Sequence, residues 1–391
     1  MKLDFLIQNG RVVDPSRGFD AIRDIGVRDG EIVDAAGREG IEPLFVFDAS
    51  DLLVLPGLID FHAHVFFGGS DLALSPDLFT LPMGVTTVVD AGTAGTANLA
   101  ALRSCCSHAQ VRMKYQVNLS PAGLATRLHD EEIDPARWDR ARLKRICLEN
   151  DENLVGLKIR LSREIVGEFG VEPLVEAVRL SNEIRAHAPG DPCLERATRI
   201  VVHTTDPPAH IAQVAGLLRK DDVFVHAYQG VGMNIIEDGT VHPSIREARG
   251  RGVLFDAANG KGHFSFAVAE AAIADGFPPD IISTDLTPVS NVKHAIGLPH
   301  LMSRYLMMGL DLHDIVTATT ATPARLLGMS ERIGTLRPGA CADVSIFSLR
   351  RGEIVFTDTS GAQRTGDRFF MPELVLSAGR IAFRQMDRRI D

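Results

Sequence analysis

The fold of this chain is decided by residues 52–64, LLVLPGLIDFHAH, an apolar run that ends on His62 and His64. Side chains two apart on a strand share a face, so these two imidazoles can bind one ion. Imidazole is a good ligand for zinc and similar divalent metals. Gly68 and Gly69 follow, which indicates a buried strand that runs out into a loop. The alternative is a pair of ordinary core histidines on a strand.

Length and composition set the class of protein. The 391 residues are enough for one barrel of ~250 residues with a smaller domain beside it. The net charge of -10 argues against a nucleic-acid or anionic-membrane partner. No apolar stretch approaches the ~18 residues of a membrane span, and the first residues lack a signal-peptide core. With five scattered cysteines that fit reduced thiols, the sequence predicts a cytoplasmic, enzyme-sized protein.

The predicted secondary structure of the chain changes in kind twice along its length. Both ends are typical of short strands closed by Gly, Asp or Pro, at 5–7, 11–13, 24–27, 31–33, 342–347, 353–356 and 374–376. Between them, strands alternate with amphipathic helices such as 173–187, 209–218 and 264–274. Eight strand candidates end near His62, Asp90, Leu119, Lys158, His203, His226, Asp256 and Asp285.

This alternation predicts an α/β protein with a TIM-type (β/α)8 barrel and a small β-sandwich domain built from both termini. The expected domain boundaries are 1–52 with 331–391 for the small domain, and 53–330 for the barrel. The run 121–153 is longer than a plain connector and is either a lid or an insertion.

Polar residues that could bind metal stand at several predicted strand ends. Because barrel enzymes keep their chemistry at the carboxyl ends of the strands, we expect these residues to meet at one face. They are His62, His64, Lys158, His203, His226 and Asp285. The alternatives are core histidines, a surface lysine and, for Asp285, a helix N-cap.

Lys158 is a puzzle, because a buried ammonium without a partner is costly and one beside a metal cluster is worse. The difficulty disappears if carbon dioxide converts the amine to a carbamate, whose two oxygens can bridge two cations.

The order of these motifs resembles the amidohydrolase superfamily in its two-metal form, and the resemblance covers essentially the whole chain. Residues 6–15 are similar to the first strand pair of that family, 319–328 to its last helix and 334–344 to its returning β segment. The contexts of Lys158 and His203, and residues 255–266, most resemble the deacetylase and dihydroorotase-like branch.

The resemblance implies a role for each residue of the set. Two divalent ions, with zinc expected, would be bridged by a hydroxide that attacks the substrate carbonyl. Asp285 would take the proton of that hydroxide and pass it to the leaving group. His62, His64 and Asp285 would hold one metal, His203 and His226 the other, and carboxylated Lys158 both.

Four further residues are candidates for substrate binding. Arg160, two beyond Lys158, would clamp a substrate carboxylate or else pair with a neighbouring loop. Tyr228, two beyond His226, would donate to an oxyanion or else be a core aromatic. Asn259 and His263 follow the seventh strand and would line the pocket or else face solvent.

Three functions compete on this basis, and the two catalytic ones act on a small-molecule substrate. The preferred one is deacylation of a small N-acyl amino acid or O-acyl hydroxy acid. The first alternative is a cyclic-amide hydrolase of the dihydroorotase, hydantoinase or imidase type, and the second is a metal-free, non-catalytic scaffold. After His226 the chain reads Ala-Tyr-Gln-Gly, where many deacetylase-branch members carry a second histidine, so the substrate class stays open. Related barrels often form homo-oligomers, but the sequence leaves the oligomeric state of this chain open.

Overall fold

A curved parallel sheet forms the centre of the molecule. The computed structural model describes residues 1–35, 40–293 and 295–390. Neighbouring strands of this sheet are consecutive in the chain except where a small hairpin intervenes before the last one. The seven strands are β8 (Leu58–Ala63), β9 (Val85–Gly95), β10 (Arg112–Asn118), β11 (Leu154–Arg160), β12 (Ile200–His203), β13 (Val223–Val225) and β16 (Leu254–Asp256).

The eighth position of the ring is filled by residues 281–286 without a regular strand. Isolated parallel bridges join Ile281 to Asp256 and Leu286 to Ala63, so this segment connects β16 to β8. The backbone N–H of Asp285 donates to the carbonyl of His62 at 2.7 Å. Asp285 has a φ of 49°, which breaks the extended conformation that a strand requires. The predicted TIM-type barrel is confirmed, and its eighth strand is a bridging segment.

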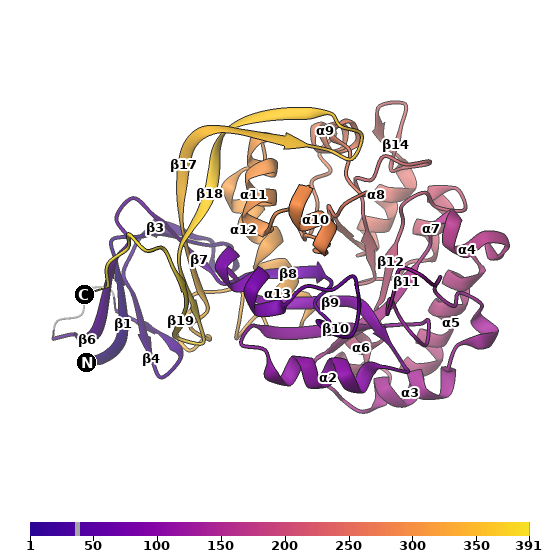
Figure 1. Cartoon of the computed structure of the whole chain (residues 1–391), viewed down its shortest axis with the longest axis horizontal. Helices are drawn as coiled ribbons and strands as arrows, with labels where there is room; N and C mark the ends of the chain where they lie inside the picture. The colour runs from indigo at the N-terminus through magenta and orange to yellow at the C-terminus, as the bar shows by residue number, and fades with distance from the viewer. Residues whose placement is uncertain (36–39, 294, 391) are drawn as a thin grey trace.

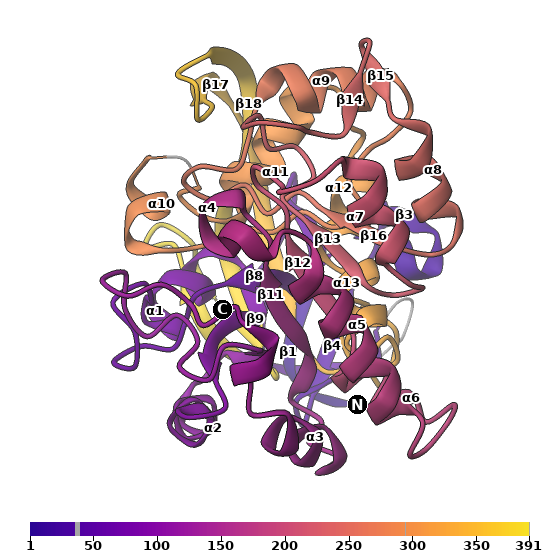
Figure 2. The same cartoon turned by 90° about the vertical axis from the view of Figure 1, so that its right-hand side faces the viewer.

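Helices cover the outside of the barrel, as Figure 2 shows for α3, α5, α6 and α7. In α5 the buried residues Leu174, Ala177, Leu180 and Ile184 recur at helical spacing and form one apolar stripe. The α-helices are α1 (Pro76–Thr80), α2 (Leu99–His108), α3 (Arg140–Leu148), α4 (Arg163–Val166), α5 (Glu172–Arg185), α6 (Pro192–Ala197), α7 (Ile211–Leu217), α8 (Pro243–Gly250), α9 (Phe266–Ala274), α10 (Pro288–Lys293), α11 (Leu298–Met307), α12 (Leu312–Thr319) and α13 (Ala321–Leu326). The short 3-10 helices are η1 (Pro15–Arg17), η2 (Leu81–Met83), η3 (Pro135–Arg137) and η4 (Gly167–Phe169).

Two further sheets combine the ends of the chain, and both termini lie on the same side of the molecule (Figure 1). Phe5 and Val27 from one sheet and Val54, Ile346 and Leu374 from the other belong to a single buried cluster, so the two sheets pack face to face. This confirms the predicted sheet domain built from both termini, while its boundaries at 52 and 331 stay a prediction. The strands are β5 (Glu31–Asp34), β4 (Ile25–Arg28), β1 (Lys2–Gln8) and β6 (Glu42–Asp48), and then β19 (Arg380–Arg384), β18 (Gln363–Ser377), β17 (Val344–Thr357), β7 (Leu53–Pro56), β2 (Arg11–Asp14) and β3 (Phe19–Ile22).

The long hairpin β17–β18 fastens the terminal sheets to the barrel. It arches over α11 in Figure 1 and reaches α9 with its tip. The backbone N–H of Phe370 donates to the Ser303 hydroxyl at 2.9 Å, and Arg364 pairs with Glu270 at 2.7 Å. A separate small hairpin, β14 (Ile236–Glu237) with β15 (Thr240–Val241), leads into α8. Within the described ranges, no helix is long and apolar enough to cross a membrane.

Candidate metal centre

Two histidines and an aspartate meet where β8 ends. His62 is the next-to-last residue of β8, His64 follows that strand, and Asp285 lies in the bridging segment beside it. The Nε2 atoms of His64 and His62 lie 3.2 and 3.5 Å from the same oxygen, Oδ1 of Asp285. All three side chains are buried. The three groups can therefore donate to a single ion.

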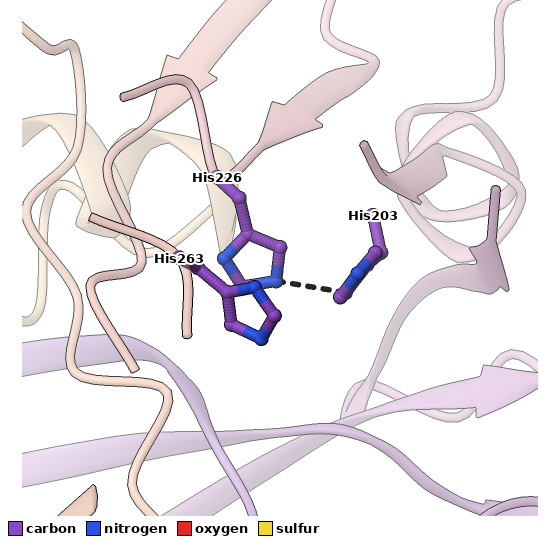
Figure 3. A group of neighbouring side chains, drawn as sticks. All are labelled: His203, His226 and His263. Atoms are coloured by element: carbon purple, nitrogen blue, oxygen red, sulfur yellow. Dashed lines mark hydrogen bonds between the residues drawn. The ribbon is translucent and has the colours of Figure 1, made fainter. Parts of the chain in front are cut away.

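Three histidines form a second donor group on the neighbouring strands (Figure 3). His203 ends β12, His226 follows β13, and His263 comes from the loop after β16. The Nε2 of His226 lies 2.8 Å from the Nδ1 of His203, and the rings of His226 and His263 are 4.0 Å apart. The Nε2 of His263 is 3.7 Å from Oδ2 of Asp285, so the two groups adjoin.

Lys158 lies between the two groups on β11. Its Nζ is 3.4 Å from the Nε2 of His62, and within the described chain it makes no salt bridge. Burial lowers the pKa of Lys158 to about 8, although Asp285 and Asp256 act in the opposite direction. A fully buried amine against an imidazole nitrogen is an unfavourable place for a permanent ammonium.

The protonation of the imidazoles suits a divalent cation. Burial lowers the pKa of His62, His203 and His226 well below the usual value, so all three are neutral near pH 7. The Nδ1 of His226 lies 2.7 Å from the carbonyl of Ala258 and must donate to it, which leaves a lone pair on Nε2 facing the cluster. The Nδ1 of His64 is held by the Thr93 hydroxyl at 2.8 Å. Oriented neutral imidazoles with one carboxylate are the ligands of zinc and related metals.

Unusual backbone conformations position these side chains. His226 and Asp285 have φ angles of 63° and 49°, a left-handed conformation that non-glycine residues seldom adopt outside functional sites. Gly260, with φ of 52°, leaves room for Asp285, because a Cβ there would lie 2.1 Å from Oδ2. Gly92, with φ of 74°, does the same for Lys158, whose Cβ would be 2.5 Å away. Sequence reasoning missed both glycines; the Asn259-Gly260 pair after a predicted strand was the available signal.

A cavity of about 330 Å³ opens onto both donor groups. Arg160 lines it, and its NH1 also donates to Glu131 at 2.9 Å, so the predicted alternative of an ion pair with a neighbouring loop is present. Glu131 is itself fixed by the amide of Asn118 at 2.8 Å. Leu124 and Arg127 also line the cavity, so the run 121–153 contributes part of the cavity wall.

Two residues expected at the cavity lie elsewhere. The Tyr228 hydroxyl donates to the carbonyl of Phe277 at 2.8 Å, and the ring is fully buried in the core. Asn259 is fully buried too, and accepts from Arg304 at 2.9 Å while its amide faces the Tyr305 hydroxyl. Neither is among the described residues that line the cavity, because both side chains are engaged in buried contacts; for Tyr228 this is the core-aromatic alternative. His263, by contrast, lines it.

A third set of possible ligands, His210, Glu237 and His242, is mostly exposed. The Nδ1 atoms of the two histidines accept from the backbone N–H groups of Ala212 and Ser244 at the starts of α7 and α8. Both rings therefore act as helix N-caps, and their remaining nitrogens carry the proton in the neutral form.

Comparison with known proteins agrees with this geometry. The amidohydrolase family matches residues 53–381. A deacetylase of Agrobacterium fabrum, Atu3266, is 33% identical over 86% of this chain and 80% of its own length. A deacetylase of Enterococcus faecalis is 28% identical over 97% of this chain and 99% of its own. A solved structure of a dihydroorotase has a TM-score of 0.84 and 29% identity, covering 98% of this chain and all of the other. The chain belongs to the amidohydrolase family and is a metal-dependent hydrolase.

Proposed function

We propose that this protein uses two metal ions to remove the acyl group from a small N-acyl amino acid or O-acyl hydroxy acid. The observation that carries the proposal is the meeting of two imidazole groups across Lys158 at one cavity. The relatives named deacetylase support acyl transfer to water as the reaction.

The donors divide between two ions, for which zinc is the expected metal. Bound ions of this kind activate the attacking water and polarise the scissile carbonyl. A carbamate on Lys158 would turn the buried amine into an anion, which removes the cost of an ammonium beside His62. In this assignment His62, His64 and Asp285 hold one ion, His203 and His226 the other, and carboxylated Lys158 both.

Asp285 is the residue placed to move a proton. Its Oδ1 lies between His62 and His64, while its Oδ2 points towards His263 and the cavity. A carboxylate there accepts the proton of the attacking water and delivers it to the leaving nitrogen or oxygen. The left-handed backbone at Asp285 and the missing side chain at Gly260 hold the carboxylate in this position.

The charges around the cavity favour a substrate with a carboxylate. Among the described residues, Arg127, Arg160 and Lys261 line the cavity with one glutamate, Glu164, beyond the metal-binding residues, while Arg160 also pairs with Glu131 and Arg127 with Asp71. An arginine is suited to bidentate recognition of a carboxylate. The volume of about 330 Å³ suits a small acylated acid.

Matched substrate pairs test this assignment. Each acylated acid is compared with its methyl ester or primary amide, which keeps the acyl group and removes the negative charge. We expect kcat/KM to fall by about tenfold to a hundredfold without the charge, as one lost charged hydrogen bond predicts. Equal rates on both members of every pair would remove the carboxylate from the proposal.

A cyclic amide is the second candidate substrate, supported by the overall likeness to the dihydroorotase structure. Hydrolysis of dihydroorotate or a hydantoin at a rate above that of the acyclic substrates would favour it. A scaffold without catalysis is disfavoured, because every position that would bind a metal holds a ligand-type side chain. A cytoplasmic location stays a prediction.

A further inference from the structure

A second polar cavity, of about 310 Å³, lies at the opposite end of the barrel. Arg199 immediately precedes β12, and Lys220 and Asp221 precede β13, so this cavity is at the amino ends of the strands. It is lined by five cationic side chains against two carboxylates, Glu195 and Asp221. The five are Arg185, Arg196, Arg199, Lys220 and Arg325.

Most of these cations have no acidic partner. Arg325 pairs with Asp221 at 3.0 Å. Among the residues that the structure describes, none of the other four makes a salt bridge. Arg185 donates to the Thr198 hydroxyl at 2.8 Å, and Arg199 donates to the carbonyl of Leu326 at 2.9 Å. The cavity therefore holds an excess of positive charge in a chain whose net charge is -10.

Arg199 is the most informative of the five cationic side chains, because of its burial and its hydrogen bonding. Its side chain is 5% exposed, and its Nε is buried without a hydrogen-bond partner in the described structure. Burial lowers the pKa of Arg199 to about 10; Asp221 and Asp222 act in the opposite direction, and Arg325 and Arg185 in the same one. A buried guanidinium that cannot readily lose its proton needs a counter-ion and acceptors for its N–H groups.

Arg196 repeats the pattern on the neighbouring helix α6. Its Nε is buried and has no partner within the described residues. Its guanidinium lies against the backbone of Gly328, where an added Cβ would be 2.9 Å from NH1. Two arginines from different elements thus line the same cavity, and each keeps a buried Nε without a hydrogen-bond partner among the described residues.

We propose that this cavity binds the phosphate group of a small molecule. Arginine forks bind phosphate oxygens through paired N–H donors, and a dianion offsets more of the excess charge than a single carboxylate. The site is a bounded cavity and not a basic stripe, and the chain is acidic overall, so a nucleic acid does not fit. This inference is independent of the proposed hydrolysis, because the two sites share no residue.

Calorimetric titration of the metal-loaded protein with inorganic phosphate tests the inference. The variant carries Lys220→Ala and Arg196→Gln, and leaves Arg199 with its bond to Leu326. We expect saturable binding at this site in the unchanged protein and an affinity at least tenfold lower in the variant, a difference of about 1.4 kcal/mol. Arg351→Gln, at an exposed position of β17 outside both cavities, is the matched control and should leave this binding event unchanged.

Phosphate that binds at the metal centre would bind equally to the unchanged protein and to the variant, so only the difference between them reports this site. No binding, or the same isotherm for both, overturns the inference.

Thermal melting separates ligand binding from a purely structural role. Phosphate should raise the Tm of the unchanged protein more than that of the variant, because only a competent site is stabilised by ligand. Glycerol 3-phosphate should act like phosphate if the site accepts phosphate esters, and acetate should have no effect. If Arg196 and Lys220 serve only a structural role, the variant melts lower by the same margin with and without phosphate, which contradicts the inference.

Discussion

The two ends of the barrel differ in the charge of the ligand that their buried side chains can bind. A single short strand, β12, has Arg199 before it and His203 at its end. At the carboxyl end, neutral imidazoles bring ring nitrogens together, with Nε2 of His226 2.8 Å from Nδ1 of His203. At the amino end, four arginines and a lysine line a cavity against two carboxylates among the described residues. The first arrangement selects a cation and the second an anion.

Burial acts on both ends in the same direction and with different consequences. It lowers the pKa of His203 well below its usual value, so the ring loses its proton and is able to act as a metal ligand. It lowers the pKa of Arg199 only to about 10, so the guanidinium stays charged at neutral pH. The chemistry of each end thus follows from how easily its side chains give up a proton.

The largest expected effect is at the carboxyl end. Asp285→Asn keeps the size of the side chain and removes its capacity to accept a proton, so kcat should fall by about 10²- to 10⁴-fold. Steady-state kinetics and metal analysis on the same sample separate lost proton transfer from lost metal. Asp20→Asn, at an exposed pair with Arg11, is the control. A kcat within a factor of about two of the unchanged protein would contradict the role of Asp285.

A pair of glycines tests how the backbone positions that carboxylate. Gly260→Ala places a methyl group against Oδ2 of Asp285 at a left-handed φ, whereas Gly262→Ala meets nothing within 4 Å. We expect the first to lower kcat about a hundredfold, as a misplaced reacting group does, and the second to change it little. Equal losses in both variants would mean that the loop tolerates neither change and that the contact with Asp285 is not the cause.

A threonine pair then distinguishes the two imidazole groups. Thr93→Val removes the hydroxyl that holds Nδ1 of His64, and metal affinity should fall about tenfold to a hundredfold. Thr205→Val removes the hydroxyl that contacts Nδ1 of His263. Because we have not assigned His263 as a metal ligand, this change should lower the metal affinity less. Competition with a chromophoric chelator measures both. A larger loss of metal affinity in Thr205→Val than in Thr93→Val would make His263 a ligand.

The smallest effect concerns acid stability away from both ends. His300 in α11 packs on Phe356, and burial lowers its pKa to about 3. The unfolded imidazole binds a proton below its ordinary pKa of about 6.5, while the folded one stays neutral, so stability is lost as the pH falls below that value.

Between about pH 7 and 4.5, the unchanged protein should therefore lose roughly 1–2 kcal/mol more of its free energy of unfolding than the His300→Phe variant does. Urea titrations at the two pH values measure the difference. Identical losses would show that the acid response comes from elsewhere, chiefly the metal end.

The sequence predicted the barrel and the gathering of the six proposed ligands because strand ends of a parallel barrel meet at one face. The expectation that side chains two residues apart share a face held only where both residues belong to one continuous strand. β11 extends to Arg160, and both Lys158 and Arg160 line the cavity. β13 stops at Val225, and the left-handed backbone of His226 turns Tyr228 into the core.

Asn259 departs from the prediction for a similar reason, since β16 ends at Asp256 and Ala258 has a φ of 32°. The amino-end cavity was not predicted at all. Its cations come from helices and loops far apart in the chain, and no local spacing links Arg185 to Arg325. Sites made by tertiary contact alone leave no periodic signal in a sequence.

Metal content per chain, measured together with the mass of the peptide that contains Lys158 under conditions that preserve carbamates, tests the central claim most directly. The account predicts two divalent ions per chain and a lysine heavier by one carbon dioxide. One ion with an unmodified Lys158, or none after reconstitution with zinc and bicarbonate, would contradict a two-metal centre at the carboxyl end of the barrel.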